Sequence, residues 1–154
     1  MHATLGRLTR GALHEISNPL LGLVGSAELA LAEAEPGTKL HARLSLAQST
    51  GAEIVEIVRA LQAFVRLQAE PAAAVSVGEA ARRAVALVER VLPTHGVTLS
   101  VSGDATLDAR PGELQGRLVE LLLEALADPG RGPAVELVVG AGVVTVTGGG
   151  ELRL

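Results

Sequence analysis

Two long helical patterns fill the first half of the chain and constrain its fold more than any other feature. In both, apolar residues recur at steps of three and four, the spacing of one face of an α-helix. The first series is Leu5, Leu8, Ala12, Ile16, Leu20, Leu23, Ala27 and Ala30; the second is Leu40, Leu44, Ala47, Gly51, Ile54, Val58, Leu61 and Val65. The second series keeps the heptad alternation throughout. Pro36 and Gly37 separate the two patterns, which predicts an antiparallel helical hairpin.

The two apolar stripes predict an oligomer. Each stripe is too long for a single hairpin to cover, whereas two hairpins that pair as a four-helix bundle would bury both. We therefore expect a homodimer. The alternative is a hairpin that is buried against the second half of its own chain.

The second half of the chain has the pattern of a small mixed domain. Ser76 and Glu79 have the spacing of a capping box before a helix that reaches Leu92. Then come a strand at residues 97–101, a helix opened by Pro111 and Gly112, and strands at residues 134–139 and 143–147. This order predicts an α/β sandwich and an α+β fold class for the whole chain. We divide the chain into a hairpin (1–70), a linker (71–75) and a second domain (76–154).

Composition excludes several classes of function. The 154 residues contain no cysteine, so disulfides and thiolate metal sites are excluded. A net charge of −4 and 1% aromatic residues argue against a nucleic-acid partner. No apolar stretch reaches the roughly 18–20 residues that span a bilayer, and no signal peptide opens the chain. We expect a cytoplasmic protein without membrane contact. The alternative is that the chain is a piece of a longer, membrane-bound protein.

His14 is the candidate reactive residue. It lies off the apolar stripe, and its neighbours on the same helical face are the polar or small residues Arg10, Gly11, Ser17 and Asn18. We therefore expect its imidazole to face solvent; the alternative is an ordinary surface histidine. Pro19 removes a backbone hydrogen bond within the same helix, so we expect a bend there. A proline that weakens a helix without improving its packing is typical of functional sites.

The residues around His14 suit phosphoryl transfer. A neutral imidazole is a good nitrogen nucleophile near physiological pH. Glu15 would accept the N–H of the second ring nitrogen, which fixes the tautomer and stabilises the developing cation. Asn18 would orient a water or a phosphoryl oxygen, and Arg10 would offset phosphate charge.

The segment His14-Glu15-x-x-Asn18-Pro19-Leu20, followed by residues 25–29, resembles the phosphoacceptor box of bacterial sensor histidine kinases. In that family the histidine lies on the first helix of a dimeric hairpin, and the resemblance extends over residues 5–68. It implies that His14 is phosphorylated, that Glu15 assists proton movement and that Asn18 serves dephosphorylation of a bound receiver domain. We expect Ser17 and Leu21, beside His14, to contact that partner.

Residues 76–154 resemble the opening part of the ATP-binding domain of these kinases, with departures. Glu120 and Glu124 stand where the family has asparagine, although a glutamate at position 124 could still meet magnesium. Glycine occupies position 148, where the family has the aspartate that reads adenine. The family's ATP lid and final phosphate loop have no counterpart in this sequence. Gly148–Gly150 is interpreted as a turn before a short last strand.

An intact hairpin beside a degenerate second domain resembles the dimeric histidine phosphotransferases. We therefore expect His14 to exchange a phosphoryl group with the aspartate of a response-regulator receiver domain, without ATP. No tightly bound cofactor is expected, and any magnesium would come with the receiver. The alternatives are a sensor histidine kinase with a divergent or truncated catalytic domain, and an adaptor or phosphatase that binds a receiver without holding phosphate.

Overall fold

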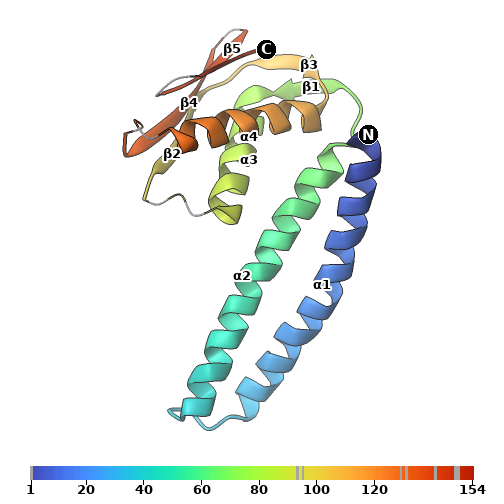
Figure 1. Cartoon of the computed structure of the whole chain (residues 1–154), viewed down its shortest axis with the longest axis vertical. Helices are drawn as coiled ribbons and strands as arrows, with labels where there is room; N and C mark the ends of the chain where they lie inside the picture. Colours follow the sequence, from blue (N-terminus) through green and yellow to red (C-terminus); the bar gives the residue numbers. More distant parts are fainter. Residues whose placement is uncertain are drawn as a thin grey trace. The chain divides into compact units, whose positions relative to one another are not determined.

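The chain forms two compact units, Met1–Val65 and Arg66–Leu154. The computed structural model describes residues 2–92, 94, 96–128, 130, 132–140, 142–147 and 150–154, without the side chains of residues 2–7. Its four α-helices and two small sheets confirm the α+β class (Figure 1). Each unit is described separately below.

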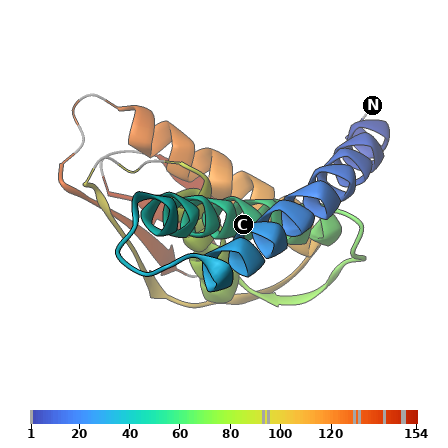
Figure 2. The same cartoon turned by 90° about the horizontal axis from the view of Figure 1, so that it is seen from below.

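Two long helices, α1 (His2–Glu33) and α2 (Lys39–Leu67), make the first unit, as the two patterns predict. Figures 1 and 2 show them side by side, joined by a short connection and inclined to each other. In that connection Gly37 has a φ of 82°, a value that glycine adopts without strain. The Thr38 hydroxyl then caps α2 by accepting the His41 N–H at 3.1 Å, which fixes where the helix begins.

The core of the hairpin differs from the predicted apolar stripe on α1. Leu13, which the spacing left off the stripe, is buried and packs with Val58 and Val65 of α2. Ile16 and Leu23, which the spacing put on the stripe, are 52% and 64% exposed. The contact inside the hairpin is therefore shifted around α1, and part of the predicted stripe stays open to solvent.

The second unit contains two helices and six strands. Its elements in chain order are β1 (Ala73–Ser76), α3 (Val77–Val91), β2 (Thr98–Gly103), β3 (Thr106–Ala109), α4 (Pro111–Ala127), β4 (Ala134–Gly140), β5 (Val143–Val146) and β6 (Glu151–Arg153). Strands β2, β4, β5 and β6 form one sheet in that order, with β2 and β4 parallel and the other pairs antiparallel. Strands β1 and β3 form a separate antiparallel pair.

Most of the predicted elements of this unit are confirmed, including the short last strand, although Gly148 and Gly149 of the preceding turn lie outside the described residues. One strand was missed. β1 occupies Ala73–Ser76, so most of the stretch predicted as a linker is paired backbone. Short, alanine-containing strands have weak intrinsic preference, and pairing with a distant segment decides them.

Helices α3 and α4 pack against each other and against the large sheet (Figure 1). The side chains that are almost fully buried come from both helices and from the two central strands. They are Val77, Val88, Leu118, Leu122, Val135, Leu137 and Val144. This apolar core accounts for the stability of the unit.

Asp104 fastens the connection between β2 and β3 to the start of α3. Its carboxylate accepts hydrogen bonds from the Ser76 hydroxyl (2.9 Å), the Gly78 N–H (2.7 Å) and the Ala105 N–H (2.8 Å). Ser76 in turn caps α3 by accepting the Glu79 N–H at 3.0 Å, as the sequence predicts. The Gly78 N–H and then the Ser76 hydroxyl contribute most to holding the pKa of Asp104 below its ordinary value, because both stabilise the ionised form.

We predict that Asp104→Asn lowers the urea midpoint of unfolding at neutral pH and removes part of its acid dependence. Because the folded-state pKa is lowered, the stabilisation by ionised Asp104 is present above about pH 3.8 and is lost as the pH falls through the lowered value. Urea titrations at several pH values test this. Asp108→Asn is the matched control, since the side chain of Asp108 is exposed on β3 and has no hydrogen-bond partner among the described residues. Equal midpoints for both variants would refute the role of Asp104.

Candidate functional site

The structure places His14 on an exposed face of α1, as predicted. Arg10, one turn before it, and Asn18, one turn after it, are also exposed, and Ser17 is half-buried. Residues three and four apart on a helix are neighbours, so these side chains share one surface. Leu21 continues this surface and is 46% exposed.

The His14 imidazole has no hydrogen-bond partner among the described residues. Glu15 is adjacent in sequence and is exposed, but no hydrogen bond joins it to His14 in the described part of the chain. The ring nitrogens are therefore accessible to an incoming group. The proposed assistance by Glu15 requires its side chain to turn toward the imidazole, which an exposed glutamate does at little cost.

Pro19 lies inside α1, which continues without interruption to Glu33. Because proline has no N–H, the carbonyl of Glu15 loses the hydrogen bond that residue 19 would otherwise donate. The turn that follows His14 is thus one backbone hydrogen bond short. The predicted bend stays a prediction.

One residue near the site was missed by the sequence analysis. The Gln62 side chain of α2 donates a hydrogen bond from Nε2 to the Leu13 carbonyl oxygen at 3.2 Å. No signal in the sequence singled it out, because Gln62 follows the heptad residue Leu61 at a position where polar residues are common. The spacing alone could not identify its partner on α1.

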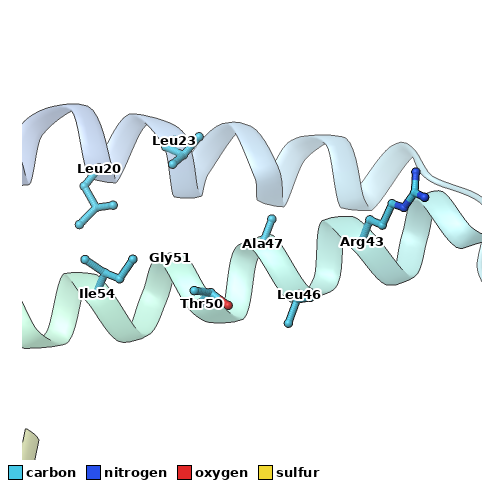
Figure 3. Close-up of a pocket in the computed structure, with 8 residues that line it drawn as sticks. All are labelled: Leu20, Leu23, Arg43, Leu46, Ala47, Thr50, Gly51 and Ile54. Atoms are coloured by element: carbon cyan, nitrogen blue, oxygen red, sulfur yellow. The ribbon is translucent and has the colours of Figure 1, made fainter.

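An open apolar groove of about 340 Å³ runs between α1 and α2 farther along the hairpin. Figure 3 shows Leu20 of α1 and Ile54 of α2 pointing toward each other across it, with Arg43 at the end nearer the connection. The remaining lining residues are Leu23, Leu46, Ala47, Thr50 and Gly51. Leu23, Leu46 and Ile54 are 64%, 67% and 42% exposed, so these apolar side chains of the groove are accessible to solvent.

The described residues of the second unit offer no comparable cluster of reactive groups. Glu120 and Glu124 are both exposed on α4. Nowhere in the described part of the chain do three histidine or acidic side chains come together at a distance that would suit a metal ion. Among the described helices, none has both the length and the apolar character needed to cross a bilayer.

Comparison with known proteins supports the fold. No protein-family model matches the sequence, and no curated protein matches it. Among solved structures the chain is similar to full-length ShkA, a hybrid histidine kinase, in complex with AMPPNP. The TM-score is 0.50 at 22% sequence identity, and the match covers 91% of this chain and 32% of ShkA. The chain therefore has a histidine kinase-related fold and spans about a third of the length of that protein.

We predict that Leu13 and Leu21, which both lie near His14 on α1, differ in how much they contribute to the free energy of unfolding. Leu13→Ala should lower the free energy of unfolding by about 2–4 kcal/mol, because Leu13 is buried against Val58 and Val65. Leu21→Ala should change it by less than about 0.5 kcal/mol, since Leu21 is largely exposed. Urea denaturation followed by the helical circular dichroism signal measures both. A loss at Leu21 as large as that at Leu13 would contradict the hairpin packing described here.

Proposed function

We propose that this protein is a histidine phosphotransferase of a two-component phosphorelay, in which His14 exchanges a phosphoryl group with the aspartate of a receiver domain. The observation that carries the proposal is the exposed, unpartnered imidazole of His14 one turn before a helix-interior proline. The histidine kinase-related fold supports a role in two-component signalling.

The proposed reaction is a reversible transfer between oxygen and nitrogen. The lone pair of one His14 ring nitrogen attacks the phosphorus of the aspartyl phosphate, an N–P bond forms, and the O–P bond to the receiver carboxylate breaks. The other ring nitrogen keeps its proton, which Glu15 holds as the positive charge develops. Arg10 lies one turn away and offsets the charge of the phosphoryl oxygens. Magnesium, where the step needs it, is supplied by the receiver.

Ser17, Asn18 and Leu21 form the neighbouring surface that receives the partner in this proposal. Leu21 supplies exposed apolar area next to His14, and such area stabilises a docked protein. Asn18 is placed to orient a phosphoryl oxygen or a water. These roles rest on the position of the residues on one face of α1.

The geometry after β5 favours a protein that works without ATP. The resemblance would place the nucleotide between α4 and the connection that follows β5. There the Gly150 carbonyl accepts the Val146 N–H at 3.0 Å, and a Cβ added at Gly150 would lie 2.9 Å from Leu121 Cδ1. Gly150, just before β6, thus lies against an apolar side chain. Position 148 is glycine and so supplies no carboxylate to read adenine, and no step of the proposed reaction uses a nucleotide.

The test is a labelling experiment with two phosphate sources. The purified protein is mixed with a candidate receiver domain that carries labelled phosphate on its aspartate, and separately with labelled Mg-ATP. We expect acid-labile label on the protein from the receiver only. His14→Ala should abolish it, whereas His41→Ala, a change at a histidine of α2, should leave it within about twofold, because only His14 is the acceptor.

Other outcomes would favour the two alternatives. Label that arrives from ATP on the wild-type protein would identify a kinase with a divergent catalytic domain. Absence of label from either source, together with receiver binding that survives His14→Ala, would identify an adaptor or phosphatase. Either result would overturn the phosphotransferase proposal.

The proposed homodimer explains the groove between α1 and α2. A second hairpin would cover Leu20, Leu23 and Ile54 and complete a four-helix bundle. Ile54→Lys should weaken the dimer at least about a hundredfold, because an unpaired ammonium is costly to bury. Leu29→Lys is the matched control, since Leu29 is 71% exposed and does not line the groove. Sedimentation velocity over a concentration series measures both; a monomeric wild-type protein would refute the dimer.

A further inference from the structure

The turn of α1 that carries His14 is held from the other helix. Gln62 of α2 lies 49 residues from Leu13 in sequence, yet its Nε2 reaches the Leu13 carbonyl oxygen at 3.2 Å. The side chain of Leu13 is meanwhile buried against Val58 and Val65, which lie one turn before and one turn after Gln62 on α2. The residue before His14 is therefore fixed both by its side chain and by its backbone.

This hydrogen bond lies next to the turn of α1 that lacks a backbone hydrogen bond. In an α-helix the Leu13 carbonyl accepts the Ser17 N–H, and the Glu15 carbonyl would accept an N–H from position 19. Pro19 cannot donate, so the segment from His14 to Pro19 has one bond fewer than a regular helix. The Gln62 amide adds a second donor to the Leu13 carbonyl, two residues before the orphaned acceptor, and limits how far the weakened turn can open.

The Gln62 side chain lies at the edge of the contact between the two helices. It follows Leu61, which occupies the heptad position, and it is half-buried. A hydrogen bond from this edge to the backbone of α1 fixes a geometry that an apolar contact does not. Gln48 lies two heptads earlier at the equivalent position and is also half-buried, but its side chain has no hydrogen-bond partner among the described residues.

We propose that Gln62 is a positioning residue for the His14 site, which acts by anchoring the Leu13 carbonyl and so keeps the imidazole in one orientation for attack. The proposal rests on the proposed function of His14. Positioning matters because reaction rates fall steeply when the reacting atoms are misplaced by as little as about 1 Å. Gln62 itself touches neither the phosphoryl group nor the imidazole in this scheme.

Two variants of the full chain test this role, and each has a matched control. Gln62→Leu and Gln62→Glu both remove the N–H donor, the first with an apolar and the second with a polar side chain of similar size. Gln48→Leu and Gln48→Glu make the same changes at the equivalent heptad position. Three quantities are measured: the rate of His14 phosphorylation by potassium phosphoramidate, the hydrogen-exchange rate of the Ser17 and Asn18 amides, and the urea midpoint of unfolding. Phosphoramidate transfers its phosphoryl group to imidazole and releases ammonia.

We expect both Gln62 variants to be phosphorylated about tenfold more slowly, and their Ser17 and Asn18 amides to exchange about tenfold faster, than in the wild type. Gln62→Leu should do so with an unchanged or higher urea midpoint, which a purely structural role would not produce. The Gln48 variants should stay within about twofold of the wild type in both rates. Phosphorylation and exchange that are equal in the Gln62 and Gln48 variants would overturn the proposal.

Failure of the proposed function would be visible separately. Wild-type protein that takes no phosphate on His14 from either phosphoramidate or a receiver would refute the phosphotransferase. The exchange of the Ser17 and Asn18 amides does not depend on phosphorylation. It would then decide alone whether Gln62 holds this turn of α1.

Discussion

The burial of Leu13 between Val58 and Val65 is the contact on which the candidate site depends. Successive residues of a helix are turned by about 100° from one another, so fixing Leu13 toward α2 sets the rotation of α1 about its own axis. His14 is consequently directed away from the hairpin contact and into solvent. The same rotation leaves Ile16 and Leu23 exposed, where a second hairpin can cover them. One packed leucine thus determines where His14 and the exposed apolar residues Ile16 and Leu23 lie around the axis of α1.

A helix that displays a reactive group one turn before a proline needs support from outside itself. Pro19 costs α1 a backbone hydrogen bond, and a lone helix of this kind would tend to bend or fray there. In the hairpin, α2 supplies both an apolar contact to Leu13 and a hydrogen bond from Gln62. The turn before His14 is therefore held by α2, although the turn after it lacks one backbone hydrogen bond.

The sequence was sufficient wherever structure is decided by local spacing. The two helices, the Ser76 cap and the hairpin of β4 and β5 follow from periodicity and from short motifs, and the exposure of His14 follows from its polar neighbours. What could not be predicted depends on pairs far apart in the chain. Asp104 has no local reason to contact Ser76, and Gln62 has none to contact Leu13. Apolar spacing also could not tell which residues of α1 pack against α2 of the same hairpin and which would face a second hairpin, because the expected four-helix bundle would bury both sets.

In the second unit the residues that form the core are separate from the positions where the sequence departs from the kinase pattern. The match to ShkA at 22% identity spans 91% of this chain, although the aspartate that the kinase pattern expects at position 148 is replaced by glycine. On α4 the residues that hold the fold, Leu118 and Leu122, face the sheet, whereas Glu120 and Glu124 are exposed on the same helix. Substitutions on the exposed side therefore cost the core nothing. Because the residues that form the core of α4 and the residues at positions 120 and 124 lie on different sides of the helix, likeness to a kinase fold does not by itself determine the chemistry of this chain.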